Sequence, residues 1–155
     1  MSTRATLFLA VGLFLTSTSW AGSPGAIYAP GMKQLVPLDI KALLKLGPDA
    51  DWSQGVRVKN LSSSEKASAH IVWINTEEKL HVHAKHDATV VVLKGRGTFR
   101  YGSQDFKMKE GDVFTVTRGT AHAFRNDSKE PTALYVVFSP PFDGKDVIEA
   151  GDVVQ

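Results

Sequence analysis

Three histidines are the residues of this chain whose types and spacing best suggest chemistry. His81 and His83 are separated by one residue, so on a β-strand both imidazoles point to the same face. His122 follows later, after a segment that begins at Gly111 and turns again at Gly119. Neutral imidazole is the commonest protein ligand for a transition metal, and three converging imidazoles suit a divalent ion. The pattern predicts a metal site, with iron, zinc, manganese, nickel and copper all left open.

Short strands must position these histidines, because the surrounding sequence alternates between apolar and polar residues and is broken by turn residues. Closely spaced short strands of this kind are typical of an antiparallel sandwich or barrel. One short helix is predicted over 40–46, capped by Asp39 and ended by Gly47 and Pro48. We expect strands at residues 56–58, 69–74, 79–83, 89–93, 97–101, 106–108, 113–116, 122–125 and 133–138.

Two segments around the histidines resemble the two sequence motifs of the cupin family. The first motif, G(X)5HXH(X)3,4E(X)6G, is matched at His81, His83 and Gly95. The second, G(X)5PXG(X)2H(X)3N, is matched at Gly111, Gly119, His122 and Asn126, with Thr117 in place of proline. The resemblance covers about residues 70–140. It implies an all-β fold, a single cupin-type antiparallel β-barrel (double-stranded β-helix or jelly roll) with an N-terminal arm and one short helix.

In cupins, both histidines and the glutamate of the first motif bind the metal, together with the histidine of the second. The resemblance therefore implies His81, His83 and His122 as ligands, whereas Ala88 stands where the glutamate is expected. His86 shares a face with position 88 if this segment is extended, and Asp87 lies one residue away. Either residue is a candidate for the vacant place. A solvated turn is the interpretation that we favour for both.

Three neutral imidazoles would leave a bound metal Lewis-acidic, with positions open for water, oxygen or a substrate. The resemblance to three-histidine cupins thus implies dioxygenase-type activity on a small molecule. A non-catalytic binder of a metal or small ligand is the alternative, and a degenerate, metal-free cupin with packed histidines is a third interpretation. The fold alone does not choose among them, because cupins host many chemistries.

Other polar residues have simpler explanations than a role in a site. His70 stands alone in a predicted strand and is interpreted as a surface or hydrogen-bonded histidine rather than a ligand. Arg100 and Arg125 are candidates to bind an anionic substrate, although solvated side chains are the simpler explanation. Glu77 and Glu78 are candidate general acids or bases without a clear setting.

Composition places the chain among ordinary globular proteins. Of its 155 residues, 43% are hydrophobic and 22% are charged, which suits one domain with its own core. The formal charge of +2 is scattered, so nothing predicts nucleic acid as a partner. Cysteine is absent, which excludes disulfides, thiolate metal sites and a cysteine nucleophile. The expected partners are a small molecule and, by the cupin resemblance, a second copy of the chain in a homodimer.

The N-terminus has the pattern of a secretory signal peptide. Arg4 precedes an apolar stretch at 5–15 that is short for a membrane span, and small residues favour cleavage after Ala21. The mature protein is then expected to be secreted or periplasmic, without a stable membrane span, and an uncleaved anchor is the alternative. The predicted organisation is a signal peptide at 1–21, an arm and short helix at 22–55, the barrel at 56–140 and a C-terminal tail at 141–155.

Overall fold

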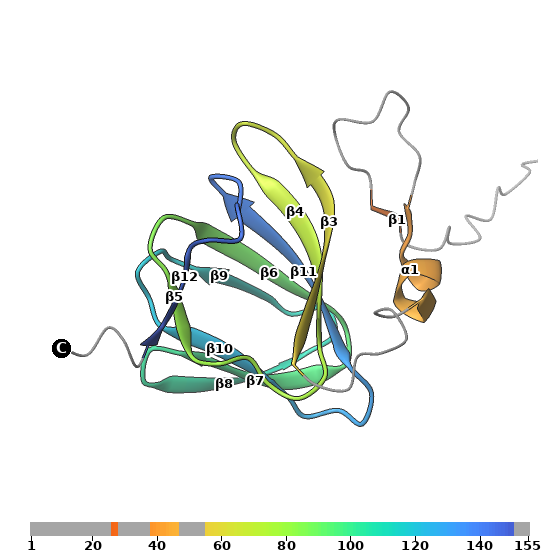
Figure 1. The fold of residues 1–155 in the computed structure, drawn as a ribbon. Coiled ribbons are helices and arrows are strands. Elements are labelled where there is room, and N and C mark those ends of the chain that lie inside the picture. The colour runs from red at the N-terminus through yellow and green to blue at the C-terminus, as the bar shows by residue number, and fades with distance from the viewer. Residues whose placement is uncertain (1–25, 28–37, 47–54, 151–155) are drawn as a thin grey trace, which may run out of the picture.

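Two five-stranded antiparallel sheets form the body of the protein (Figure 1). The structure is a computed structural model that describes residues 26–27, 38–46 and 55–150. In spatial order, the first sheet contains β12 (Val147–Glu149), β5 (His81–His83), β10 (His122–Asn126), β7 (Arg96–Tyr101) and β8 (Gln104–Lys109). The second sheet contains β3 (Val56–Ser63), β4 (Ser68–Ile74), β11 (Thr132–Ser139), β6 (Asp87–Lys94) and β9 (Val113–Val116). From β5 onward the chain passes repeatedly between the two sheets, and the expected all-β barrel is confirmed.

A short pairing precedes the barrel and leads into the helix. Strand β1 (Ala26–Ile27) pairs with β2 (Leu38–Asp39), so the segment predicted to be an arm contains a short strand. Helix α1 (Ile40–Leu46) then begins where Oδ1 of Asp39 accepts hydrogen bonds from the backbone N–H groups of Lys41 and Ala42, at 2.9 and 3.2 Å. The predicted helix and its cap are confirmed. The predicted signal peptide lies outside the described residues.

Strand β4 is buried along its whole length because it is covered on both faces. Its residues Val72 and Ile74 join the core between the sheets. On the opposite face, Ile71 and Trp73 pack with Leu43 of α1, whose side chain is 5% exposed. Burying a leucine of this kind contributes about 2 kcal/mol. The helix therefore covers the outside of the second sheet, beside β3 and β4 (Figure 1).

Every strand expected between residues 56 and 138 overlaps an observed strand. The main addition is β12, which pairs antiparallel with β5 inside the segment predicted to be a C-terminal tail, 141–155. Three residues are too few to show a period, and the strand forms because the folded sheet offers it the free edge of β5. Within the residues that the structure describes, no helix is long and apolar enough to cross a membrane.

Candidate metal centre

The three predicted histidines come together where β5 and β10 pair. His81 and His122 are register partners on these antiparallel strands, and directly opposite residues are close neighbours across a sheet. His83 follows on the same face of β5, two residues along. Ring centroids are 4.4 Å apart for His81 and His122, 5.0 Å for His81 and His83, and 5.2 Å for His83 and His122. One ring nitrogen of each histidine lies within 4.8 Å of those of the other two.

A tight turn before β10 aligns His122 with β5. Gly119 has a φ of +79°, a left-handed conformation that costs a residue with a Cβ about 1–2 kcal/mol. Its N–H donates a hydrogen bond to the carbonyl oxygen of His83 at 2.8 Å, so the turn is tied directly to the histidine strand. At the other end of β10, the side-chain amide of Asn126 donates to two backbone carbonyls at 2.8 and 2.9 Å. These motif residues therefore hold the backbone that carries His122.

Backbone carbonyls fix the tautomer of all three rings. Nδ1 of His81 lies 2.8 Å from the carbonyl oxygen of Lys79, and Nδ1 of His122 lies 2.9 Å from that of Thr120. Nδ1 of His83 lies 3.3 Å from the carbonyl oxygen of Asp146. A carbonyl oxygen only accepts hydrogen bonds, so each Nδ1 must carry the proton. Nε2 of each ring is then the nitrogen with a free lone pair, as a metal ligand requires.

Burial holds two of these imidazoles in the neutral form near pH 7. Desolvation lowers the pKa of His83 to about 4, and the neighbouring His81 adds to this effect. Desolvation likewise lowers the pKa of His122 to about 4, although its hydrogen bond to the Thr120 carbonyl acts in the opposite direction. Only neutral imidazole binds a metal, so these ligands would not have to lose a proton first. The donor set suits a divalent transition ion.

The place of the missing glutamate is apolar. Ala88 is 3% exposed and lines the same cavity as the three histidines. Asp87 lies outside the histidine cluster, in a partly exposed ion pair. Its carboxylate accepts hydrogen bonds from the backbone N–H of Arg118 at 2.9 Å and from Nη2 of that residue at 2.6 Å. These bonds lower the pKa of Asp87 to about 2. Asp87 therefore does not replace the glutamate.

His86 is buried, so the solvated turn expected for it is wrong. It is 4% exposed, and its Nδ1 lies 2.5 Å from Oδ2 of Asp146. Its Nε2 lies 3.1 Å from the carbonyl oxygen of Pro141, so both ring nitrogens have partners. His86 forms a second cluster with His83 and Asp146 rather than adding to the first one. The physical reason is a long-range contact, because Asp146 follows His86 by 60 residues.

The C-terminal segment takes part in the site, although its sequence predicts only a tail. Besides its contacts with the two histidines, Asp146 accepts a hydrogen bond from the backbone N–H of Lys85 at 2.8 Å. Phe142 stacks on Phe138 with ring centroids 4.7 Å apart, and both rings contact His83 edge-on. No motif or spacing marks these residues, which fall in the segment predicted to be a C-terminal tail.

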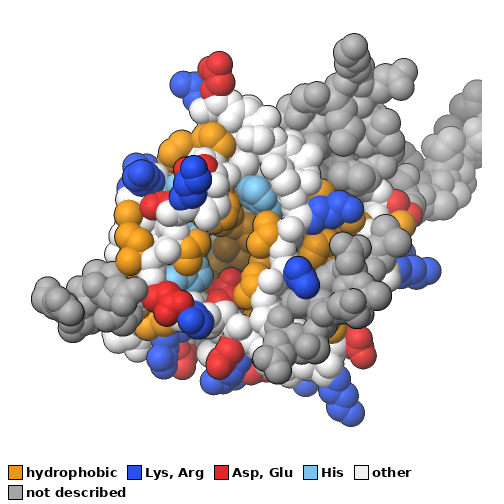
Figure 2. All heavy atoms as spheres, in the orientation of Figure 1, with side chains coloured by type: hydrophobic (Ala, Val, Ile, Leu, Met, Phe, Trp, Pro, Cys, Tyr) orange, Lys and Arg blue, Asp and Glu red, His pale blue; other side chains and the backbone are white. Residues whose placement is uncertain are grey.

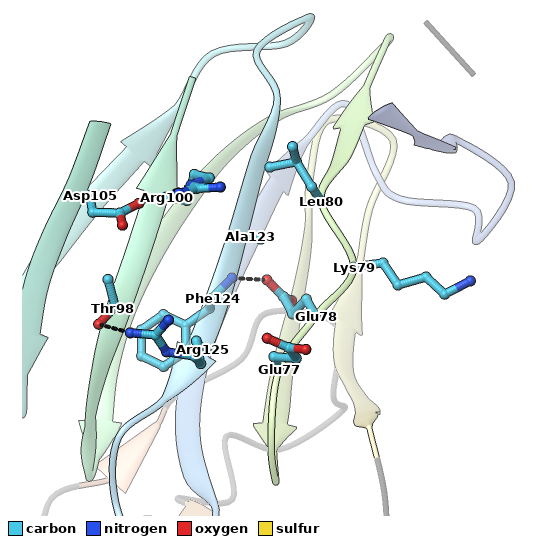
Figure 3. Close-up of a pocket in the computed structure, with 10 residues that line it drawn as sticks. All are labelled: Glu77, Glu78, Lys79, Leu80, Thr98, Arg100, Asp105, Ala123, Phe124 and Arg125. Atoms are coloured by element: carbon cyan, nitrogen blue, oxygen red, sulfur yellow. Dashed lines mark hydrogen bonds and ion pairs between the residues drawn. The ribbon is translucent and has the colours of Figure 1, made fainter. Parts of the chain in front are cut away.

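The remaining candidates lie outside the cluster of three histidines. His70 is buried, and its Nε2 lies 2.8 Å from Oγ of Ser68, whereas its Nδ1 has no hydrogen-bond partner among the described residues. Arg100 and Arg125 line a groove on the surface (Figure 3). Arg100 pairs with Asp105 at 2.9 Å, and Arg125 pairs with Asp127 at 3.3 Å. Both arginines are thus already matched with an acid.

The histidines lie in an apolar cavity that opens on one face of the molecule. Figure 2 shows hydrophobic side chains around this opening and histidine side chains within it. The inner part, about 50 Å³, is walled by Phe99, Phe124 and Phe138 beside the histidines. The outer part, about 420 Å³, is lined by apolar residues such as Val58 and Phe142, together with charged residues that include Glu77, Lys79 and Glu149. Apolar walls with a few polar groups are typical of small-molecule sites.

The neighbouring acids Glu77 and Glu78 differ in environment. Glu77 is exposed, and its backbone forms an isolated bridge with Arg125. Glu78 lines the cavity together with the three histidines. Burial raises the pKa of Glu78, although the nearby His81 and a hydrogen bond from the backbone of Phe124 lower it. Of the two acids, Glu78 is therefore the one placed to act in the site.

Fold and site together define a double-stranded β-helix protein with a centre of three histidines. Residues 70–138 match the family described as cupin domain, which supports the resemblance that the two motifs implied. An uncharacterised protein from Aquifex aeolicus (strain VF5) is 37% identical over 113 residues, which cover 72% of this chain and 93% of that protein.

Two further relatives carry names. L-ectoine synthase from Aliivibrio fischeri (strain MJ11) is 24% identical over 102 residues, which cover 64% of this chain and 80% of the synthase. The structure of KdgF from Halomonas sp. superposes with a TM-score of 0.55 at 20% identity, over 63% of this chain and 92% of KdgF. The likeness to KdgF shows a shared fold.

Proposed function

We propose that this protein binds a divalent transition metal through Nε2 of His81, His83 and His122. The observation that carries the proposal is the set of three hydrogen bonds from Nδ1 to backbone carbonyls, which leaves three convergent rings with a free lone pair on Nε2. Packed histidines of a metal-free barrel would have no need for one common tautomer. Iron, zinc, manganese, nickel and copper are the candidate ions.

The activity that we propose is metal-dependent, dioxygenase-type chemistry on a small molecule. Three protein ligands leave coordination positions free, and a bound metal would supply Lewis acidity and a place for oxygen or substrate. The apolar cavity supports a substrate that is largely hydrophobic next to its ligating group. The name of the L-ectoine synthase relative supports a catalytic rather than a purely binding role.

This chain's own residues would bind and shield the substrate. Phe138 and Phe142 wall the cavity beside His83 and would exclude water from one side of the reacting group. Glu78 is the acid in the inner cavity that could accept a proton from a bound group or return one to it. The proposed location is the periplasm or the exterior of the cell, which rests on the N-terminal sequence alone.

Metal analysis of the purified full-length protein tests the first step. We expect about one equivalent of transition metal per chain and tight uptake of added Co²⁺ or Fe²⁺, with both lost in His122→Ala. His70→Ala is the matched control, since it removes another buried histidine that lies outside the cluster. No metal uptake by the wild-type protein would refute metal binding and leave a metal-free cupin.

Oxygen consumption then separates the enzyme from a non-catalytic binder. The iron-loaded protein is mixed with diketone, phenolic or thiol candidates, and oxygen uptake is compared with that of His122→Ala. Uptake that requires His122 supports catalysis. Metal binding without uptake for any of the three classes favours a binding protein.

A further inference from the structure

Glu78 places a carboxyl group in a cavity otherwise lined by imidazoles and apolar side chains. The inner cavity is lined by the three histidines and by apolar side chains, and Glu78 is the one acid among the described residues around it. Neither lysine nor arginine belongs to that lining. The same side chain also borders the outer, wider part of the cavity. Glu78 therefore borders both parts of the cavity, as His81 and His83 do.

Strand geometry holds this carboxylate in place. The backbone N–H of Glu78 donates to the carbonyl oxygen of Phe124 at 2.9 Å, and the backbone N–H of Phe124 donates to Oε2 of Glu78 at 2.8 Å (Figure 3). The Glu78 carboxyl oxygen thus accepts the hydrogen bond that a backbone carbonyl of a neighbouring strand would otherwise accept from Phe124. This bond uses Oε2, so Oε1 keeps its capacity to accept hydrogen bonds from a water or a ligand.

Charge balance indicates what this carboxylate is for. Removing a carboxylate from water without a cation is costly, and desolvation accordingly raises the pKa of the partly buried Glu78. The described residues that line the inner cavity include neither lysine nor arginine, so no permanently charged cation faces Glu78 there. A divalent ion on the three imidazoles would supply a compensating charge. Ala88 stands where the cupin motif has its acid. The cavity nevertheless combines three imidazoles with one carboxyl group, because Glu78, just before β5, supplies it.

We propose that Glu78 is the charge partner of the metal centre, in place of the acid missing at Ala88. This inference rests on the proposed metal binding. Glu78 does not belong to the group of ligand atoms that lie within 4.8 Å of one another, so it acts from outside the ligand set. It stabilises the dication across the cavity and accepts a hydrogen bond from a water or substrate group that the metal binds.

The test compares Glu78→Gln with Glu77→Gln in Co²⁺ titrations of the full-length protein. Glutamine at 78 keeps an oxygen that accepts the hydrogen bond from Phe124 and removes only the charge. We expect the dissociation constant for Co²⁺ to rise about 10- to 100-fold, while the thermal midpoint of the metal-free protein stays the same or rises. Glu77→Gln makes the same change of charge at an exposed neighbour that borders the outer part of the cavity but not the inner part, and it should bind Co²⁺ like the wild type.

Three results would overturn the inference. Equal Co²⁺ affinity in Glu78→Gln and Glu77→Gln would show that the charge at 78 has no part in binding. Weaker binding together with a lower midpoint of metal-free Glu78→Gln would show a structural role instead. If the wild-type protein binds no Co²⁺, the proposed function fails as well. If His122→Ala abolishes Co²⁺ binding but Glu78→Gln retains it, this inference alone is refuted.

Discussion

Mild acid should destabilise the metal-free protein, and the loss of stability should begin at a pH well above the range in which its surface carboxylates titrate. The folded pKa values of His83 and His122 are about 4, whereas an unfolded histidine titrates near 6.5. Between these values the unfolded chain binds more protons than the folded one, so the free energy of unfolding must fall as pH falls. The stabilisation from neutral histidines is complete above the unfolded pKa and is lost towards the folded pKa.

The size of this effect follows from the two pKa values. Lowering the pH from about 7 to about 5 removes at most about 2 kcal/mol per histidine, or about 4 kcal/mol for the pair. Glu78 acts in the opposite direction, because its raised pKa lets the folded protein take up that proton first. The observed loss should therefore be somewhat smaller than the sum of the two histidine contributions.

Urea unfolding of the metal-free protein, followed by circular dichroism at several pH values, measures this loss. His122→Asn isolates one contribution, since it removes a titrating ring and leaves Glu78 in place. We expect its pH dependence to be smaller than that of the wild type by about 2 kcal/mol over the same range. Equal pH dependence in the two proteins, or a flat wild-type curve, would refute the claim that these histidines are neutral because they are buried.

Three further predictions concern stability. In Gly97→Ala, the added Cβ would overlap the ring of Phe124 and the carbonyl oxygen of Arg125. We therefore expect urea titrations to show a free energy of unfolding lower by about 1–3 kcal/mol, and unchanged stability would contradict this. Asp146→Asn removes the charged partner of buried His86, and thermal unfolding should show a free energy of unfolding lower by about 3 kcal/mol. A negligible change would mean that other contacts hold the C-terminal segment. Metal at about 100 times its dissociation constant should stabilise the wild type by about 2.7 kcal/mol but not His122→Ala, as calorimetry can check.

The sequence predicted the barrel because its signals are local. Alternation along residues 69–74 and 133–138 and the turns at Gly111 and Gly119 are visible in short windows of sequence. The approach of His81 to His122 also follows from pattern, since both lie in recognisable motifs. The structure adds that they are register partners across two paired strands.

The sequence could not predict contacts made across long separations. His86 looks like a turn residue because its partner, Asp146, lies 60 residues further on in a segment without a pattern. Strand β12 is three residues long, and its only cue is the open edge of β5. The sequence does not distinguish Glu78 from its neighbour Glu77, because the two have the same side chain. Only the fold shows which of the two lines the inner cavity beside the histidines.

The acceptors that orient the metal-site histidines belong to the main chain, so they do not depend on which side chains stand at their positions. Lys79 and Thr120 can be exchanged for other residues while their carbonyls still hold the rings of His81 and His122. The third acceptor is different, because the carbonyl of Asp146 reaches His83 only when the distant segment that carries it is docked. Relatives can thus vary freely next to two of the imidazoles, whereas changes that loosen the end of the chain should disturb the third.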